Sequence, residues 1–367
     1  MSKVFFGSAY AGQLRSEATL PARLDEILTR LDIARELDGK RACIKMHMGT
    51  GIGYSTTHPL FVRRLASFIK AAGGDPFVTD TLGGTKSAAE RGYTPEVMGC
   101  PIIPAAGSED KHFYSHAINY KNLKEIQIGR EMTDADYLVC LSHAKGHGNS
   151  GYGGALKNLA LGAMVQSTRN NMHMIHHADP YWDADKCTHY SDGCKLCVEE
   201  CPVSTMRFAD DQKLHVGFYE CNLCLRCNEV CPVDALTVRS EIADAFQELI
   251  ALASQAVLGS FPNGNAVFIN FAVDITPVCD CVGFTTASLV PDIGIFASKD
   301  IVAVDKATLD SIDYRNLLAG TVPPPLVMQD KDGWHLFQRI HGKDPYVQVY
   351  AAERLGLGNS KYELEEV

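Results

Sequence analysis

The chain has 367 residues, of which 46% are hydrophobic and 21% charged, so we expect a globular protein with a sizeable core and exclude a disordered chain. Its formal net charge is -10 and it has no basic run, so we expect neither nucleic acid nor a membrane as a partner. The N-terminal residues lack a signal-peptide pattern and no apolar stretch is long enough to span a bilayer, which together predict a cytoplasmic protein.

The first half of the sequence alternates between helical and strand-like patterns. We expect helices over Leu20–Leu37, His58–Ala72 and Ala155–Leu161, and strands over Arg41–His47, Pro76–Thr81 and Ala135–Ser142. This alternation predicts an α/β fold, in which βαβ units build a mostly parallel sheet with helices on both faces.

The pattern stops at a polar and aromatic connector, His173–Asp185, and resumes after a cysteine-rich segment. The later part predicts a helix over Glu241–Leu258, strands over Ala266–Val273, Gly294–Ala297 and Ile301–Val304, a helix from Lys306 and a closing helix over Pro345–Leu355. We therefore predict one discontinuous α/β domain, residues 1–180 and 241–367, and a small α+β module inserted at residues 181–240.

Thirteen cysteines occur, and eight of them lie between Cys187 and Cys231, which favours metal binding over a disulfide framework. The second half of this segment is Cys221-x2-Cys224-x2-Cys227-x3-Cys231-Pro232, the spacing of a bacterial ferredoxin. The first half, Cys187-x6-Cys194-x2-Cys197-x3-Cys201-Pro202, repeats it with a wider first gap.

This doubled spacing predicts two [4Fe–4S] clusters with crossed ligation. One cluster is expected on Cys187, Cys194, Cys197 and Cys231, and the other on Cys221, Cys224, Cys227 and Cys201. Structural zinc is the alternative, since C-x2-C pairs also build zinc ribbons, but the third and fourth cysteines of each half favour iron and sulfide.

Five cysteines lie outside this segment. Cys43 and Cys140 fall in apolar strands and Cys100 in a strand-like context, so we expect inert buried thiols there. In Cys279-Asp280-Cys281, two thiols flank a carboxylate after a strand. They are suited to an additional metal or to a redox pair, although an exposed turn fits the pattern equally well.

The sequence Ser142–His147 follows a buried strand, at the end where open α/β sheets bind ligands. We take His143, Lys145 and His147 as candidate catalytic residues, and Gly153, Gly154, Lys157 and Asn158 as candidate substrate-binding residues. A glycine loop that leads into a helix N-terminus beside two lysines favours a small anionic ligand. The alternative is a packing loop with a solvated lysine.

Three other sites carry polar side chains. His47 and the pair Asp80-Thr81 also end strands, where each alone is more typical of a capped strand end, although three strand ends at one edge suggest a shared site. For His173, His176 and His177 we expect surface or interdomain hydrogen bonds in preference to metal binding.

Four segments together resemble one known family, the domain-of-unknown-function family 362: Ser142–His147, Gly151–Gly162, Cys279–Cys281 and Asp292–Asp305. Members of that family often carry an inserted ferredoxin module, and the resemblance covers nearly the whole chain. It implies the architecture and the two clusters, and it implies no particular substrate.

Three functions follow as hypotheses. The first is a redox enzyme whose clusters deliver low-potential electrons to a small anionic substrate or cofactor, in a cleft that Lys145, His147, Lys157 and Cys279–Cys281 share and that faces a cluster. The second is a non-enzymatic ferredoxin-type electron carrier, and the third is a cofactor or metal maturation factor that uses Cys279 and Cys281. The enzyme is favoured because a carrier needs no large second domain. Each requires a redox partner protein as electron donor or acceptor.

Overall fold

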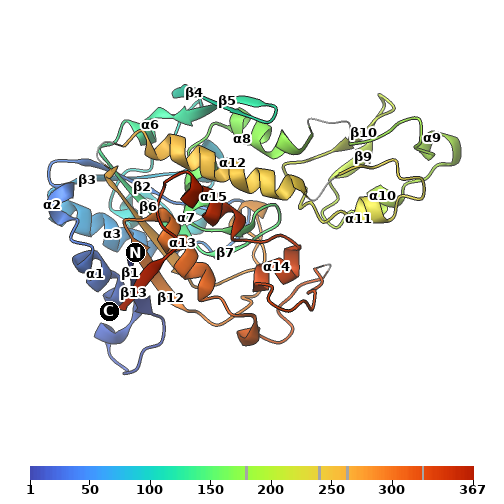
Figure 1. The fold of residues 1–367 in the computed structure, drawn as a ribbon. Coiled ribbons are helices and arrows are strands. Elements are labelled where there is room, and N and C mark those ends of the chain that lie inside the picture. The colour runs from blue at the N-terminus through green and yellow to red at the C-terminus, as the bar shows by residue number, and fades with distance from the viewer. Residues whose placement is uncertain (178–180, 239–240, 262–263, 325) are drawn as a thin grey trace.

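A seven-stranded sheet in the order β13-β1-β12-β11-β6-β2-β3 forms the centre of the protein (Figure 1). The computed structural model describes residues 1–177, 181–238, 241–261, 264–324 and 326–367. The strands of this sheet are β1 (Ser2–Ser8), β2 (Arg41–Lys45), β3 (Asp75–Thr79), β6 (Tyr137–His143), β11 (Ala266–Ala272), β12 (Gly294–Ser298) and β13 (Tyr362–Glu366).

Four neighbouring strands, β11, β6, β2 and β3, run parallel to one another. Lys45 of β2 pairs with Cys140 on one side and with Thr79 on the other, and Leu141 of β6 pairs with Ile269 of β11. β12 is antiparallel to both of its neighbours, β1 and β11. At the end of the sheet, β13 and β1 pair in parallel. The mostly parallel α/β sheet predicted from the sequence is thus confirmed, and the carboxyl ends of four adjacent strands meet at one edge.

Helices cover both faces of the sheet, as predicted (Figure 1). Those packed on one face are α1 (Leu20–Arg30), α2 (Ala34–Leu37), α3 (Pro59–Ala71) and α5 (Pro95–Met98). Those packed on the other are α6 (Arg130–Thr133), α7 (Ala155–Gly162), α8 (Gln166–His173), α12 (Glu241–Leu258), α13 (Ile301–Asp310), α14 (Leu336–His341) and α15 (Val347–Arg354).

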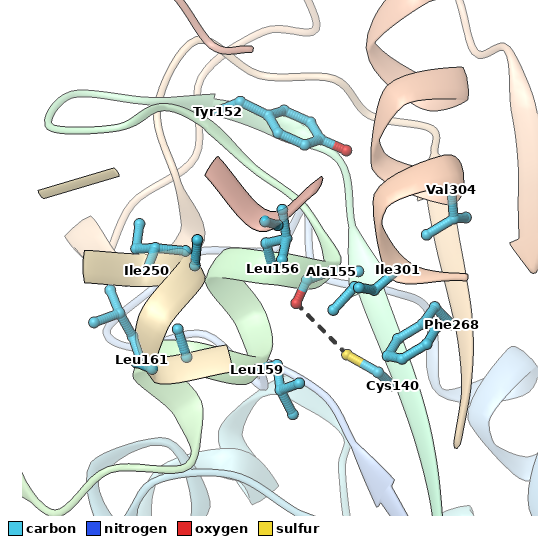
Figure 2. Close-up of a cluster of buried hydrophobic side chains, with 14 of the residues drawn as sticks. Cys140, Tyr152, Ala155, Leu156, Leu159, Leu161, Ile250, Phe268, Ile301 and Val304 are labelled. Atoms are coloured by element: carbon cyan, nitrogen blue, oxygen red, sulfur yellow. Dashed lines mark hydrogen bonds between the residues drawn. The ribbon is translucent and has the colours of Figure 1, made fainter. Parts of the chain in front are cut away.

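Alternation along the strands divides the core into two layers. In β6, Leu138 and Cys140 face the layer of α7 and α12, whereas Val139 and Leu141 face the layer of α1 and α3. Figure 2 shows the first layer, where the Cys140 sulfur lies 3.8 Å from the Ala155 carbonyl. Cys43, Cys100 and Cys140 are all buried as expected, and burial raises the pKa of Cys140 to about 11.

The cysteine-rich segment forms a small module that extends from one end of the α/β part (Figure 1). Its elements are α9 (His189–Asp192), α10 (Leu196–Glu199), β9 (Met206–Phe208), β10 (Leu214–Val216) and α11 (Arg226–Glu229), with β9 and β10 antiparallel. β6, which precedes this segment, pairs with β11, which follows it. The exact domain bounds remain a prediction.

Two sequence predictions of local structure are wrong. The expected helix Leu20–Leu37 is divided into α1 and α2, and Asp32 between them has a φ of 51°. Residues Ile301–Val304, expected as a strand, open α13, because the Asp300 side chain accepts hydrogen bonds from Val302 N and Ala303 N, both at 2.9 Å. The four residues are all buried, so they have no periodicity that separates a helix from a strand.

Several shorter elements have no counterpart among those predicted from the sequence. The strands β4 (Phe113–Tyr120) and β5 (Leu123–Gly129) form a hairpin, and α4 (Leu82–Lys86) follows β3. The glycine-rich loop contains a second hairpin, built from β7 (Lys145–His147) and β8 (Gly151–Gly153). Across the described ranges, no helix combines the length and the apolar character needed to cross a bilayer.

Candidate functional site

A cavity of about 700 Å³ opens at the edge where the four parallel strands end. Its walls come from the ends of β2 and β3, from the β7–β8 hairpin and α7, from the loop after β11, and from the cysteine-rich module. The lining includes Lys45, His47, Asp80, Lys145, His147, Gly153, Gly154, Lys157, Asn158, Pro202, Tyr219, Asn222, Cys279 and Cys281.

This cavity brings together most of the site residues singled out in the sequence. Lys145, His147 and Lys157 border it together with both cysteines of the Cys279–Cys281 loop. Pro202 and Asn222, which directly follow Cys201 and Cys221, border it from the module. The cavity therefore lies between the strand ends and the two cysteine runs.

Asp280 organises one side of the cavity from a buried position. Its Oδ2 atom lies 2.9 Å from Lys145 Nζ and 3.0 Å from His143 Nδ1, and its Oδ1 accepts a hydrogen bond of 2.8 Å from Ser55 Oγ. Burial alone would raise the pKa of Asp280, but Lys145 and His143 hold that pKa well below its usual value. The ionised carboxylate in turn fixes the Lys145 ammonium at the cavity wall.

His143, one of the predicted catalytic residues, contacts Asp280 and is not part of the cavity wall. Its Nε2 atom donates to the Val273 carbonyl at 2.8 Å and its Nδ1 lies against Asp280, so both ring nitrogens are engaged. The side chain is buried and is absent from the residues that line the cavity in the described structure. His143 therefore positions Asp280 and does not reach a ligand in the cavity.

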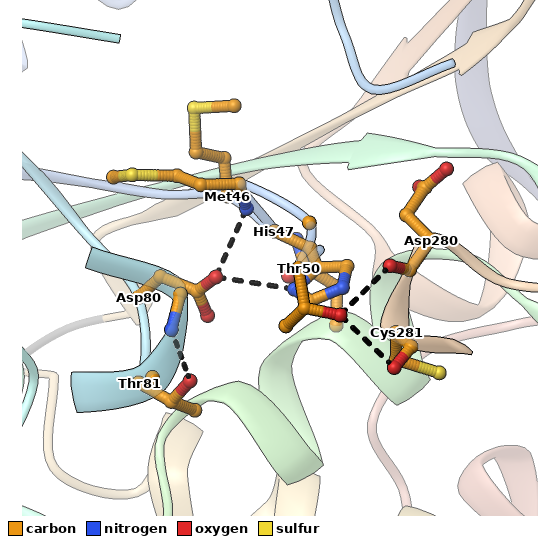
Figure 3. Close-up of polar contacts among 12 residues, drawn as sticks. Met46, His47, Thr50, Asp80, Thr81, Asp280 and Cys281 are labelled. Carbon is orange, nitrogen blue, oxygen red and sulfur yellow. Dashed lines mark hydrogen bonds and ion pairs between the residues drawn. The ribbon is translucent and has the colours of Figure 1, made fainter. Parts of the chain in front are cut away.

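A second buried carboxylate, Asp80, lies on the opposite side of the cavity. Its Oδ1 is 3.2 Å from Lys45 Nζ, and its Oδ2 accepts a hydrogen bond of 2.9 Å from Met48 N. The same Oδ2 lies 3.1 Å from His47 Nδ1, and Figure 3 shows this contact between Asp80 and His47. Burial opposes ionisation, yet Lys45 and His47 hold the pKa of Asp80 well below its usual value. Lys45 also donates to Asn158 Oδ1 at 2.8 Å, which links the ends of β2 and β3 to α7.

His47 is more significant than its sequence context suggested. Its Nδ1 contacts Asp80, while its buried Nε2 has no hydrogen-bond partner among the described residues. A carboxylate on one nitrogen orients the ring and leaves the other nitrogen to exchange a proton. Sequence analysis missed Lys45 altogether, although a lysine inside the otherwise apolar strand that precedes His47 was a usable signal.

Cys279 and Cys281 face Lys157 across the cavity. The Lys157 ammonium donates to the Cys279 sulfur at 3.1 Å and to the Cys281 sulfur at 3.8 Å. A hydrogen bond from Cys281, together with the charges of Lys157 and Lys145, outweighs burial and holds the pKa of Cys279 well below its usual value. The pair is therefore more than an exposed turn, because Cys279 is buried and carries a cationic partner.

The N-terminus of α7 is not the anion site that the glycine loop suggested. Asp305 already accepts hydrogen bonds from Ala155 N at 2.8 Å and from Leu156 N at 2.9 Å. Gly154 is needed at this close approach, because a Cβ atom there would lie 2.4 Å from Asp305 Oδ1. The positive charge offered to the cavity by α7 is thus the Lys157 side chain.

Contacts from the α/β part hold the module against the cavity. A Cβ atom on Gly148 would lie 2.8 Å from the Asn222 Cβ, so only glycine allows this approach. Lys343 Nζ donates to the carbonyls of Asn222 at 2.8 Å and Leu223 at 3.1 Å.

The His173 ring packs against Tyr219 of the module, with the ring centres 4.5 Å apart, and burial lowers the pKa of His173 to about 4. Its Nδ1 lies 2.7 Å from the Arg169 carbonyl, so the hydrogen bond of His173 stays within α8. The contact of His173 with the module is made by the packing of its ring against that of Tyr219. The side chains of His176 and His177 lie outside the described part of the chain.

The eight module cysteines divide into two sets of four. Cys187, Cys194, Cys197 and Cys231 border one small cavity, and Cys201, Cys221, Cys224 and Cys227 border another. In each set, one cysteine comes from the other half of the sequence motif, which is the crossed arrangement predicted from the spacing. Four thiolate donors around one cavity suit an iron–sulfur cluster.

The chain matches one family model and one known ferredoxin. The model of the family described as Domain of unknown function (DUF362) matches residues 43–310. The ferredoxin of Methanothermococcus thermolithotrophicus is 35% identical over 57 residues, which make up 16% of this chain and 92% of the ferredoxin. With the cysteine motif, that match identifies an iron–sulfur-binding protein.

Among solved structures, the chain is similar to the lactate racemase apoprotein of Thermoanaerobacterium thermosaccharolyticum. The identity is 13% and the TM-score 0.33, over 75% of this chain and 51% of the racemase. The chain thus spans about half the length of that protein.

Proposed function

The chain belongs to the family described as Domain of unknown function (DUF362), and within it we propose that the protein is an iron–sulfur redox enzyme. Two [4Fe–4S] clusters in the module would supply low-potential electrons to a small anionic substrate or cofactor in the cavity. The observation that carries this proposal is the shared cavity, which residues next to Cys201 and Cys221 border together with the polar strand ends.

The two sets of four cysteines support two clusters with crossed ligation. When bound, such clusters accept and release single electrons at potentials set by their surroundings. The chain contributes the thiolates, and Lys343 and Gly148 hold the loop of Cys221 against the cavity through Asn222. A ligand in the cavity would therefore lie beside the loops that carry cluster cysteines.

The charges around the cavity support an anionic ligand. Lys45 is paired with Asp80 and Lys145 with Asp280, so both are neutralised. In the described part of the chain, Lys157 contacts the two sulfur atoms of Cys279 and Cys281 and no carboxylate. Lys157 is thus a cation available to a substrate, together with Arg169, which also lines the cavity and has no carboxylate partner among the described residues, and His47 Nε2 is the group placed to give or take a proton.

A pure electron carrier has no use for this cavity, since electron exchange between proteins takes place at a docking surface. The enzyme proposal therefore explains more of the structure. It still requires a redox partner protein, which would exchange electrons with the module.

A reoxidation assay tests the proposal. Anaerobically reduced protein is mixed with a panel of small carboxylates and phosphate esters, and the visible absorbance of the clusters is followed. We expect at least one compound to reoxidise the protein with a rate that saturates. The Lys157→Met variant should lose at least about 10-fold of this rate, because a transition-state ion pair of about 1.4 kcal/mol or more is removed.

The matched control is Lys111→Met, since Lys111 is exposed and pairs with Glu109 on the surface. It should keep the rate of the parent. If every compound reoxidises both variants and the parent equally, without saturation, the cavity is not the electron acceptor site and the carrier hypothesis is correct.

A further inference from the structure

Three possible metal ligands meet in the cavity, away from the module cysteines. One ring nitrogen of His147 and the sulfur atoms of Cys279 and Cys281 all lie within 4.8 Å of one another. They come from β7 and from the loop after β11, which are far apart in the sequence. Such a convergence of one imidazole and two thiols is a donor set for borderline and soft transition metals.

The His147 ring is held in the orientation that a metal ligand needs. Ser150 Oγ lies 3.0 Å from His147 Nδ1 and itself donates to the Tyr152 carbonyl at 2.8 Å. The backbone N–H groups of Asn149 and Ser150 both donate to His147 Nδ1, at 3.3 and 3.2 Å, and these contacts fix the ring. A metal at Nε2 requires the ring proton on Nδ1, where Ser150 Oγ would accept it in place of the two N–H donors.

The loop that carries the two thiols is also fixed. Asp280, between them, binds Lys145 and Ser55 and is therefore not available as a ligand. Thr50 Oγ1 lies 3.2 Å from the Cys281 carbonyl and 3.4 Å from that of Asp280 (Figure 3). These contacts hold the loop with both sulfur atoms toward Lys157 and His147.

We propose that His147, Cys279 and Cys281 bind one divalent transition-metal ion of the zinc type, with a fourth position open to the cavity. Structural zinc sites use four protein ligands, whereas three protein ligands and an open position are typical of catalytic sites. Binding forms one metal–nitrogen and two metal–sulfur bonds, releases the thiol proton of Cys281 to solvent and moves the ring proton of His147 from Nε2 to Nδ1, with no change of oxidation state.

The surrounding charges fit this ion. Two thiolates neutralise the charge of a divalent metal, and Lys157 donates hydrogen bonds to both sulfur atoms at 3.1 and 3.8 Å. One positive charge then remains beside the open position, which suits an anionic ligand with an oxygen donor. The site uses none of the eight module cysteines, so the inference does not depend on the proposed electron transfer.

Metal analysis of the intact protein tests the inference. Anaerobic holoprotein is incubated with Zn²⁺, desalted, and analysed for zinc, iron and sulfide. We expect about one zinc per chain, and zinc-edge X-ray absorption should show two sulfur atoms at about 2.3 Å and a nitrogen at about 2.0 Å. Cys279→Ser and Cys281→Ser should each lose the zinc while keeping the iron and sulfide of the parent, and His147→Asn should weaken zinc binding at least about 10-fold.

The matched control is Cys100→Ala, which removes a buried thiol outside the cavity and should retain the zinc. Three results of the metal analysis would overturn the inference. They are a parent that retains no zinc, equal retention in the Cys279 and Cys281 variants, and a coordination shell of four sulfur atoms, which would place the zinc on the module cysteines. A Cys279–Cys281 disulfide in the anaerobic protein, detected by mass spectrometry, would equally overturn it.

Discussion

Single charged side chains buried at the strand ends shape the cavity. Lys45 and Asp80 have no exposed side-chain surface, and each has further hydrogen bonds, from Lys45 to Asn158 and from Met48 to Asp80. A buried ion pair contributes little stability compared with apolar residues of the same size, but the loss of one partner leaves the other charge buried and unpaired. The pair therefore contributes more to the arrangement of the site than to the stability of the fold.

The Asp80→Asn substitution tests this role. Because it leaves the Lys45 ammonium without its counter-ion, we expect the free energy of opening of β2 and β3 to fall by about 3–5 kcal/mol. Hydrogen exchange of the amides of both strands, followed by mass spectrometry, measures the loss. Replacing Lys45 by Met in the same variant should restore part of it, and unchanged exchange in Asp80→Asn would contradict the account.

The pH dependence has a defined sign. The folded-state pKa of Asp80 is depressed, so its contribution to stability is complete above the unfolded value of about 3.9 and is lost as the pH falls below it. The parent should thus lose stability on acidification below about pH 4, and Asp80→Asn should lack that part of the loss. Neither protein should change through this group between about pH 6 and 8.

Among the helices and strands, the N-terminus of α7 joins the part of the α/β fold that precedes the module to the part that follows it. Asp305 of α13 caps α7 from another helix, and it also accepts a hydrogen bond of 2.7 Å from Asn270 of β11. α7 carries Lys157 and Asn158, so this cap sets how both side chains enter the cavity.

Removal of the cap should loosen α7 selectively. In Asp305→Ala, the buried N–H groups of Ala155 and Leu156 lose their acceptor, which costs about 1–3 kcal/mol for each group. Hydrogen exchange should therefore accelerate in α7. Asp300→Ala is the matched control, because Asp300 caps α13 itself, and it should accelerate exchange in α13 and leave α7 unchanged. Equal effects of both variants on α7 would refute the assignment.

Much of this level of structure could be predicted from the sequence, since periodicity and glycine positions are local. The strands β2, β3 and β6 were predicted, although their bounds differ slightly from the observed ones, and the parallel order brings their carboxyl ends to one edge. What could not be predicted depends on distant contacts. Asp305 accepts hydrogen bonds at the N-terminus of α7, which the glycine loop was expected to offer to a ligand. Asp280 contacts both Lys145 and His143.

At the scale of the whole molecule, the module is joined to the cavity that the α/β part forms. Tyr219 and Asn222 of the module line the cavity, and Lys343, near the other end of the chain, binds the carbonyls on the loop of Cys221. The cysteine spacing alone predicted how the eight thiols would be shared, because it is a local property of the motif. That the module would meet this edge of the sheet was expected only from the hypothesis of a redox enzyme, because the contacts that hold it there join residues more than 100 positions apart.

The iron and sulfide content of the anaerobically purified protein shows whether the module holds two [4Fe–4S] clusters. Two [4Fe–4S] clusters predict about eight iron atoms and about eight acid-labile sulfides per chain. Cys201→Ser and Cys231→Ser should each impair mainly the cluster whose other three ligands lie in the opposite half of the motif. Stoichiometric zinc on the module cysteines with negligible sulfide would contradict the account.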